Sequence, residues 1–213
     1  MKRGALIVLE GCDRSGKSTQ SKLLTEALKA SGRKAELMRF PERSTGIGQL
    51  ISSYLEKKLD LQDNAVHLLF TANRWELQPK MIKLLEAGVT LVVDRYSFSG
   101  VAFSSAKNGV DLQWCKQPEV GLPKPDLVMY LNIPSSVAAT RGQFGEERYE
   151  KEEFQKKVAN VYEVLKEDNW KVLDANRSVK DLQREIFNIT TSIVDESGLV
   201  SSESIGKLWT EQD

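Results

Sequence analysis

The sequence predicts an α/β fold with a mainly parallel sheet that is covered by helices on both faces. Strand-length apolar runs recur along the chain with helical patterns between them, as expected for strands that are buried on both sides. The runs are GALIVLE (4–10), AELMRF (35–40), VTLVVD (89–94), DLVMYLNI (126–133) and WKVLD (170–174). None of these runs approaches the roughly 18 apolar residues of a membrane span.

Length and charge narrow the class of protein. The chain has 213 residues, and we expect residues 1–213 to form a single domain. Thirty acidic and thirty basic residues give no net charge, which argues against bulk electrostatic binding of nucleic acid or of an anionic membrane. Cys12 and Cys115 are expected as free thiols, because the N-terminal segment is too short for a secretory signal. The sequence therefore predicts a cytoplasmic protein and leaves a nuclear or organellar pool open.

The first two helices have clear sequence signals. The segment from Ser18 to Ala30 carries leucines at core spacing, and Gly32 follows it as a stop signal. The segment from Ala65 to Leu85 is expected to form one or two longer helices. Pro79 is the expected break or kink in it, because proline removes a helical hydrogen bond.

The second half of the chain alternates in the same way. Segment 108–126 carries three prolines and is expected to be an irregular or briefly helical connection. Two further helices are expected around 152–167 and 179–194. The tail, about 195–213, is polar until the stretch IGKLW, which we expect to dock back on the body.

The stretch GCDRSGKST, residues 11–19, follows the first strand and precedes the first helix. Gly11, Gly16, Lys17 and Ser18 fit the spacing G-x-x-x-x-G-K-[ST], a loop whose backbone N–H groups bind phosphates. The N-terminus of the next helix adds its dipole. Lys17 is expected to reach the β- and γ-phosphates, and Ser18 to ligate Mg²⁺. The phosphate loop, 11–18, thus predicts a nucleotide site, the alternative being a glycine-rich turn without a ligand.

Asp94 closes the third strand and is followed directly by Arg95. An acid at the carboxyl end of a buried strand can hold the metal ion, directly or through water. The alternative is an acid that caps the next turn of the chain. The phosphate loop elsewhere in the sequence favours the metal-binding interpretation.

Arginines at strand ends and in site loops indicate a binding site for a phosphate acceptor, because a guanidinium binds phosphate through two hydrogen bonds. Arg43 follows the second strand and Arg95 follows the third, so both can converge on the crevice that faces the phosphate loop. Arg74 lies four residues after Phe70, a spacing that places ring and guanidinium on one helix face. Such a face could stack a base and read its edge. The alternative is Phe70 in the core and Arg74 on the surface.

Three classes of nucleotide-binding protein compete at this point: a small-molecule kinase, a GTPase-like switch and a non-catalytic scaffold. A switch needs a guanine-reading N-K-x-D after a late strand, and the sequence has none. The stretch RGQFGEERY, 141–149, has two glycines among basic residues and suits a lid, about 134–155, that closes over donor phosphates. A plain solvated loop is an equal alternative from these residues alone.

Together these motifs resemble the thymidylate kinases, a family of P-loop nucleoside-monophosphate kinases. The matching pieces run from residue 9 to about 150: LEGCDRSGKSTQ, RFPERST, HLLFTANRWE, GVTLVVDRYSFSGVAF, GLPKPDL and GQFGEERYE. The resemblance implies a three-layer P-loop kinase fold with a five-stranded parallel sheet and a short lid. It also implies transfer of the γ-phosphoryl group of ATP to dTMP, which gives ADP and dTDP in dTTP synthesis, with Mg²⁺ and in a homodimer.

The resemblance implies roles for the residues at matching positions. The ATP-binding residues are Arg14, Ser15, Gly16, Lys17, Ser18, Thr19, Arg141 and Arg177. The dTMP-binding residues are Asp13, Pro41, Arg43, Leu55, Phe70, Arg74, Arg95, Ser99, Gly100, Phe103 and Tyr149. The catalytic residues are Arg14, Lys17, Asp94 and Arg95, and the metal ligands are Ser18 and Asp94.

By the same resemblance, the acid and the base inside the phosphate loop serve different substrates. Asp13 accepts a hydrogen bond from the 3′-hydroxyl of dTMP, and Arg14 points towards the phosphoryl group in flight. A phosphomonoester has a second pKa of about 6, so the acceptor oxygen is already anionic and needs no general base. The lone His67 is therefore expected to be structural. The alternative function is a deoxynucleoside kinase acting on thymidine, with Asp13 or Glu42 as base.

Cys12 departs from the small apolar residue that the resemblance leads us to expect in the loop. The helix dipole would favour its thiolate if the side chain were partly exposed, which would make it open to alkylation. The alternative is a small buried filler.

Overall fold

The computed structural model describes residues 3–141, 147–196 and 204–210 of the chain. Its centre is a five-stranded sheet in the order β2-β3-β1-β4-β5, and every neighbouring pair of strands is parallel. The strands are β1 (Leu6–Glu10), β2 (Ala35–Arg39), β3 (Thr90–Asp94), β4 (Leu127–Asn132) and β5 (Trp170–Asp174). They coincide with the five apolar runs, so the predicted parallel sheet is confirmed.

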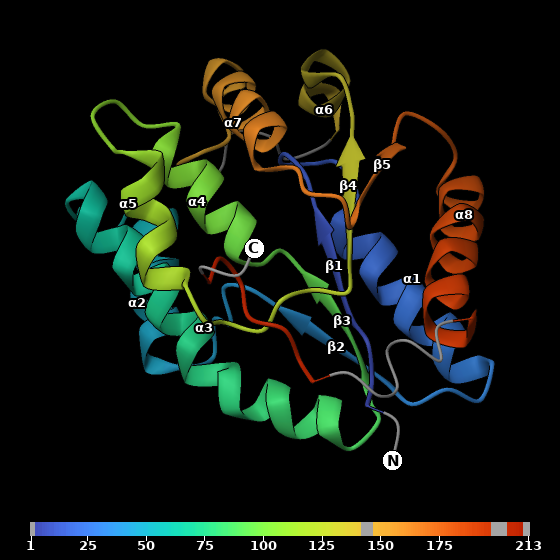
Figure 1. Cartoon of the computed structure of the whole chain (residues 1–213). Coiled ribbons are helices and arrows are strands. Elements are labelled where there is room, and N and C mark those ends of the chain that lie inside the picture. The colour runs from blue at the N-terminus through green and yellow to red at the C-terminus, as the bar shows by residue number, and fades with distance from the viewer. Residues whose placement is uncertain (1–2, 142–146, 197–203, 211–213) are drawn as a thin grey trace.

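Helices cover both faces of this sheet, which makes three layers (Figure 1). One face carries α1 (Lys17–Ala30) and α8 (Val179–Thr191). The other face carries α3 (Asp63–Glu86), α4 (Ser97–Ser105) and α7 (Glu152–Leu165). Adjacent residues of a strand belong to different core clusters, because successive side chains point to opposite faces.

β1 illustrates this alternation. Leu6 and Val8 pack with α3, α4 and α7, whereas Ile7 and Leu9 pack with α1 and α8. All four side chains are fully buried, so the central strand has no solvated face. This is why the sequence reads as a continuous apolar run rather than as an alternating one.

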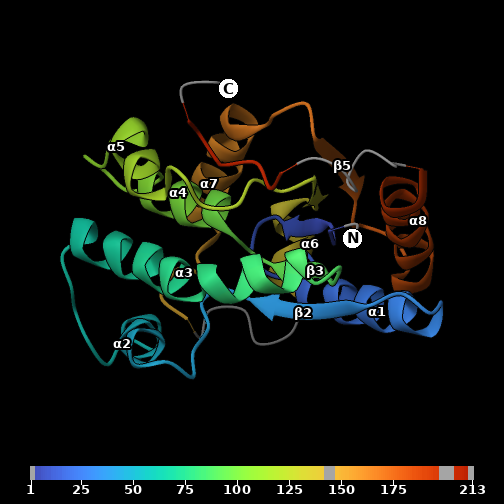
Figure 2. The same ribbon diagram turned by 60° about the horizontal axis from the view of Figure 1, so that its bottom comes forward.

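The remaining helices lie at the ends of the layers. They are α2 (Gly46–Leu55), α5 (Leu112–Lys116), the 3-10 turn η1 (Gln117–Glu119), α6 (Ser135–Thr140) and the turn η2 (Ser192–Glu196), which continues α8. α2 lies beside α3, and α1 lies beside α8 (Figure 2). Within the described ranges, no helix is both long enough and apolar enough to cross a membrane.

The sequence expectation contained no helix at the places of α2, α4 and α6, and it left one or two helices open for the segment that forms α3. α3 continues through Pro79 as a single helix, and its second half is anchored to the sheet by the buried side chains of Met81 and Leu85. α4 has no clear sequence signal, because SFSGVAFSS is rich in serine and contains glycine. It forms in contact with α3 and α7, which supply the packing that its own propensity lacks.

Residues 204–210 dock on the body, as expected from IGKLW. Leu208 is fully buried in the cluster that contains α4 and α7. Its backbone accepts a hydrogen bond from Gly121 at 3.0 Å and donates one to Leu122 at 2.8 Å. The tail thereby covers the loop that leads into β4.

The register of the sheet aligns the segments that form the site. Leu9 of β1 pairs with Asp94 of β3, and Arg39 of β2 pairs with the same Asp94. The segments that follow these three strands therefore leave the sheet side by side at its carboxyl edge. This confirms the predicted convergence of the phosphate loop with the segments that carry Arg43 and Arg95.

Candidate active site

A cavity of about 640 Å³ opens at the carboxyl edge of the sheet. Its wall combines the phosphate loop, one face each of α3 and α4, and the segments that follow β2 and β5. Every residue to which the resemblance assigned a binding or catalytic role lies in this wall, except Asp94; Gly11 of the loop motif and Glu42 do not line it. Asp94 lies directly behind the wall, in contact with Ser18.

The phosphate loop bends through three residues with positive φ, Gly11 (φ 144°), Arg14 (φ 62°) and Gly16 (φ 97°), and Gly16 is the N-cap of α1. Lys17 folds back under the loop, where its Nζ donates to the Cys12 carbonyl at 2.6 Å and to Ser15 Oγ at 3.1 Å. Burial, reinforced by the charge of Arg95, lowers the pKa of Lys17 to about 8. The Cys12 carbonyl and the Ser15 hydroxyl thus hold the Lys17 ammonium group at the position where bound phosphates would contact it.

Ser18 and Asp94 form the candidate metal site. Ser18 Oγ donates to Asp94 Oδ2 at 2.5 Å. Asp94 Oδ1 is buried and has no hydrogen-bond partner among the described residues. Nor do those residues contain a cluster of three His, Cys, Asp or Glu side chains that could hold a metal alone. The pair fits Mg²⁺, which keeps several waters and takes its other ligands from substrate phosphates.

Three arginines of the cavity form ion pairs with carboxylates of the phosphate loop and of the segment 147–150, and a fourth, Arg39, pairs with Asp94 at 3.5 Å. Arg95 pairs with Asp13 and also donates to Ser99 Oγ at 3.1 Å. Arg14 pairs with Glu150 at 2.8 Å. In the same manner, Arg43 pairs with Glu147 at 2.7 Å.

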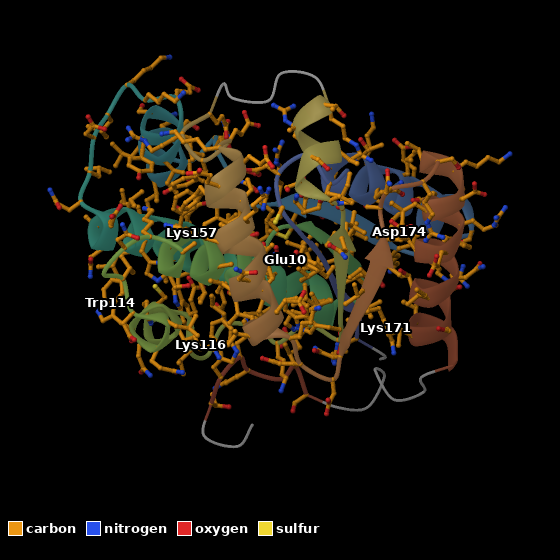
Figure 3. The ribbon with its side chains drawn as sticks, turned by 90° about the horizontal axis from the view of Figure 1, so that it is seen from above. Glu10, Trp114, Lys116, Lys157, Lys171 and Asp174 are labelled. Carbon is orange, nitrogen blue, oxygen red and sulfur yellow. The ribbon has the colours of Figure 1, made fainter. Side chains whose placement is uncertain are left out.

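Glu10 fixes the position of Arg95. Its buried carboxylate, at the end of β1, accepts hydrogen bonds from the backbone N–H groups of Tyr96 at 2.8 Å and Ser99 at 3.1 Å. It also accepts from the hydroxyls of Ser99 at 2.5 Å and Tyr162 at 2.9 Å, between the sheet and α7 (Figure 3). Burial raises the pKa of Glu10. These bonds tie the start of α4 to β1, and Arg95 immediately before it adopts a left-handed φ of 67°.

The opposite end of the cavity contains Phe70, Arg74 and Gly100. Arg74 is 2% exposed and forms an ion pair with Glu119, which is fully buried. Its Nε donates to Glu119 Oε2 at 2.8 Å, and the hydroxyl of Thr71 donates to the other carboxylate oxygen at 2.6 Å. The interpretation of Arg74 as a surface charge is therefore wrong.

Gly100 makes room for Arg74. A Cβ atom at this position would lie 2.4 Å from Arg74 Nη2 and 3.0 Å from Cζ. Only glycine lets α4 approach the guanidinium so closely. α3 and α4 are in contact, and Phe70, Arg74 and Gly100 together line this part of the cavity, called the Phe70–Arg74 pocket below.

Aromatic rings line the middle of the cavity. Phe103 and Tyr149 pack with ring centroids 5.7 Å apart, and the guanidinium of Arg95 lies 5.2 Å above the Phe103 ring. Tyr149 also donates to the hydroxyl of Tyr54 at 3.2 Å.

The arginines around the expected lid divide into two groups. Arg141 donates to the backbone carbonyls of Arg14 at 2.9 Å and Ala175 at 3.0 Å, which places it beside the phosphate loop. Arg177 pairs with Glu185 and also lines the cavity. Arg148 instead lies outside the cavity wall, 4.3 Å above the ring of Tyr54. Residues 142–146 of the expected lid lie outside the described residues.

Cys12 is half-buried behind the phosphate loop. Its Sγ lies 3.6 Å from the Gln155 carbonyl and 3.9 Å from the hydroxyl of Tyr130. Burial raises the pKa of this thiol, despite the nearby charge of Lys17. The structure thus favours the filler interpretation over a thiolate stabilised by the helix dipole.

Several residues of the cavity wall were not found by sequence reasoning. They are Gln20, Arg39, Phe40, Tyr96, Ser104, Glu147, Glu150, Ala175, Val179 and Leu182. The acids of GEERYE gave a visible charge signal, but no pattern in the sequence says which arginine each one meets. Glu119 gave no signal at all, since it follows a proline in a segment read as irregular.

Comparisons with known proteins agree with this geometry. The family model described as thymidylate kinase matches residues 9–186. Curated thymidylate kinases from Danio rerio and Homo sapiens are 56% and 54% identical to this chain over 211 residues, which is 98% of each chain. A solved structure of thymidylate kinase from Candida albicans is similar with a TM-score of 0.87 and 35% identity, covering 97% of this chain and 99% of that one.

Proposed function

The chain belongs to the thymidylate kinase family, and from this premise we propose how its cavity transfers the γ-phosphoryl group of ATP to dTMP. The reaction gives ADP and dTDP, in dTTP synthesis. One observation carries the assignment of residues: the phosphate loop, the paired arginines and the Phe70–Arg74 pocket all line one cavity. A donor and an acceptor bound at its two ends would place their phosphates between them.

At the donor end, we assign the triphosphate of ATP to the loop residues 14–19. The Lys17 ammonium group would leave the Cys12 carbonyl and reach the β- and γ-phosphates. The negative charge of the phosphates would favour the protonated form of Lys17, which burial disfavours. Arg141 and Arg177 would lie near the adenine, since both line the cavity wall on the side of β5.

Ser18 and Asp94 would hold Mg²⁺. The bound ion would neutralise negative charge on the phosphate oxygens. In that arrangement the orphaned Oδ1 of Asp94 gains a partner, directly or through water. The buried, fixed position of Asp94 keeps Ser18 oriented towards the loop opening.

At the acceptor end, Phe70 would stack on thymine and Arg74 would hydrogen-bond its edge, while Pro41, Leu55 and Gly100 complete the pocket. Phe103 and Tyr149 would press against the deoxyribose and disfavour a 2′-hydroxyl. Asp13 would accept from the 3′-hydroxyl, which requires it to share or leave its pairing with Arg95.

The phosphate of dTMP would be held by Arg43 and Arg95. Each guanidinium is held at the cavity by a carboxylate, and a dianionic phosphate competes for it. Ser99 supports Arg95 through its hydroxyl group. No general base is needed, because the acceptor oxygen is already ionised at neutral pH.

Arg14 would contact the phosphoryl group during transfer. Its carbonyl is held by Arg141, and its guanidinium, in the cavity wall, is paired with Glu150. The alternative, an arginine supplied by the lid, is less supported for Arg148, because that side chain contacts α2 instead of the cavity.

A deoxynucleoside kinase would need a carboxylate base beside an uncharged hydroxyl. Glu42 is bound to the hydroxyl and backbone of Ser44, and Asp13 is paired with Arg95, so neither is poised as a base. An assay of ADP release with dTMP and thymidine side by side tests this choice. We expect turnover with dTMP; turnover with thymidine alone would overturn the assignment, and binding without turnover would indicate a scaffold.

The remaining features follow from the family. Residues 134–155 would act as a lid within the domain 1–213, and residues 195–213 would be a tail.

A homodimer would bury the exposed Leu68 and Trp75, which lie two turns apart on α3. Light scattering of the wild type and of Leu68→Glu tests this assembly. The free thiols Cys12 and Cys115 suit the reducing cytoplasm.

A further inference from the structure

The C-terminal segment 206–209 is hydrogen-bonded to a turn that lies behind the base end of the cavity. This turn, 119–122, is closed by the Leu122 amide, which donates to the carbonyl of the first turn residue at 3.2 Å. Leu208 binds the turn through its backbone: its carbonyl accepts from the Gly121 amide at 3.0 Å, and its amide donates to the Leu122 carbonyl at 2.8 Å. The two segments run antiparallel, and Figure 1 shows the red end of the chain beside the segment that leads into β4.

Side chains anchor the C-terminal segment to the body of the protein. Leu208 is fully buried in the core cluster that contains α4 and α7. The indole N–H of Trp209 donates to Glu167 Oε1 at 2.9 Å, and its ring packs edge-on against Phe98 with centroids 5.6 Å apart. The ammonium group of Lys116 lies 5.1 Å from the centroid of the same indole ring. The segment therefore has a fixed position from which it can hold the turn.

Glu119, the first residue of the turn, connects it to the cavity. Its fully buried carboxylate accepts from Arg74 Nε at 2.8 Å and from the Thr71 hydroxyl at 2.6 Å. Arg74 lines the cavity, whereas none of the described tail residues 204–210 does. A guanidinium has donors only, so its direction depends on the acceptors that receive its N–H groups. The position of the turn thus decides where Arg74 points.

We propose that the C-terminal segment 206–209 is a positioning element of the acceptor site: it holds the turn 119–122 and, through Glu119, holds Arg74 in the cavity wall. The affinity for the acceptor nucleotide then depends on a segment that does not line the cavity. This inference rests on the proposed function, because it assumes that the base of the acceptor occupies the Phe70–Arg74 pocket.

The turn needs this support because the chain around it forms no regular element. Between η1 and β4, residues 120–126 form neither a helix nor a strand. α3 holds the start of the connection, where the indole N–H of Trp75 donates to the Pro118 carbonyl at 2.8 Å. The tail holds its end, where the Lys124 amide donates to the Gly206 carbonyl at 2.8 Å. Loosening the tail would remove the backbone hydrogen bonds at that end and let the turn open locally.

The binding test compares two Leu→Ala variants of the full chain. Leu208→Ala removes the buried anchor of the tail. Leu28→Ala is the matched control, because Leu28 is also fully buried but belongs to the core cluster on the other face of the sheet. Titration calorimetry measures the dissociation constants for dTMP and for a non-hydrolysable ATP analogue. We expect Leu208→Ala to weaken dTMP binding about tenfold and to change binding of the analogue less than about twofold, and Leu28→Ala to change both less than about twofold.

Unchanged dTMP binding in Leu208→Ala would overturn the proposal. Equal losses in the two variants, or equal losses for dTMP and the ATP analogue, would also overturn it, because they would indicate a general loss of stability.

Hydrogen exchange measured by NMR gives a second test that needs no substrate. The Nε–H of Arg74, which donates to Glu119, should exchange about tenfold faster in Leu208→Ala than in Leu28→Ala. Equal rates would contradict the positioning role. Failure of the proposed function would appear in the wild type, as absent dTMP binding or as binding without ADP release, and the exchange rates would still test the tail.

Discussion

The two ends of the cavity hold their charged side chains in different ways. At the base end, Arg74 is 2% exposed and pairs with a carboxylate that is fully buried. At the phosphate end, Arg14 is 29% exposed and Arg43 is 37% exposed, and each pairs with a carboxylate of the expected lid. The first pair lies within the protein, whereas the second and third lie where anionic substrates would enter.

This difference suits two kinds of recognition. A base is read by hydrogen-bond direction, which requires donors and acceptors that cannot turn. A phosphate is bound by charge, and an exposed ion pair such as Arg43–Glu147 gives up a partner at little cost because it contributes about 1 kcal/mol or less. In the proposed assignment the base end is therefore preformed, and the phosphate end would exchange carboxylates for phosphates.

The largest effect is expected from breaking the buried pair. Glu119→Gln leaves the Arg74 guanidinium buried without a counter-charge, which should lower the free energy of unfolding by about 3–5 kcal/mol. Urea denaturation measures this loss of unfolding free energy. The matched change at the phosphate end, Glu147→Gln, should cost less than about 1 kcal/mol. Equal losses in the two variants would contradict the comparison.

Removal of Arg14 should act on the rate and leave dTMP binding intact. Arg14→Gly suits the left-handed backbone at this position and should lower kcat by at least about 10²-fold, with little change in the KM for dTMP. Arg148→Gly is the control, and we expect less than a threefold loss because that side chain contacts Tyr54. If Arg148→Gly loses far more than Arg14→Gly, the lid supplies the arginine.

Removal of the stacking ring tests the base end. Phe70→Ala should raise the KM for dTMP about tenfold or more, because stacking of a base on an aromatic ring contributes roughly 1–3 kcal/mol. The KM for ATP is the internal control and should barely change, since Phe70 lies away from the phosphate loop. An unchanged KM for dTMP in a folded variant would remove Phe70 from the base pocket.

The pH dependence of ATP binding tests Lys17. Its pKa of about 8 in the free protein means that the ammonium loses its proton as the pH rises through 8. Phosphates bind the protonated form, so the affinity should be constant below pH 7 and about tenfold weaker at pH 9. Calorimetry at pH 8 in buffers of different ionisation enthalpy should detect proton uptake. No uptake would mean that Lys17 is already fully charged in the free protein.

Sequence patterns were sufficient to predict the sheet and the phosphate loop. The strands are buried on both faces, so their apolar runs are continuous and do not depend on which element packs against them. The loop combines a local glycine spacing with a strand before and a helix after it, and its backbone follows from these alone. Family resemblance then placed further residues, such as Leu55 and Tyr149, in one cavity.

Local patterns failed where long-range partners decide the structure. α4 contains glycine and four serines, and it is stabilised by the buried carboxylate of Glu10 and by α3 and α7. Arg74 could be read as a surface charge because its partner, Glu119, lies 45 residues away. Likewise His67 could be read only as a helix residue until Ser104 and Cys115 were brought to its two ring nitrogens.

The sequence by itself thus determined the sheet, the nucleotide loop and the family, because these depend on periodicity and on motifs of short range. Only the tertiary structure decided which carboxylate holds each arginine and which groups meet the two ring nitrogens of His67. The physical reason is that charge pairing and hydrogen-bond direction depend on atoms a few ångströms apart that the chain brings together only on folding.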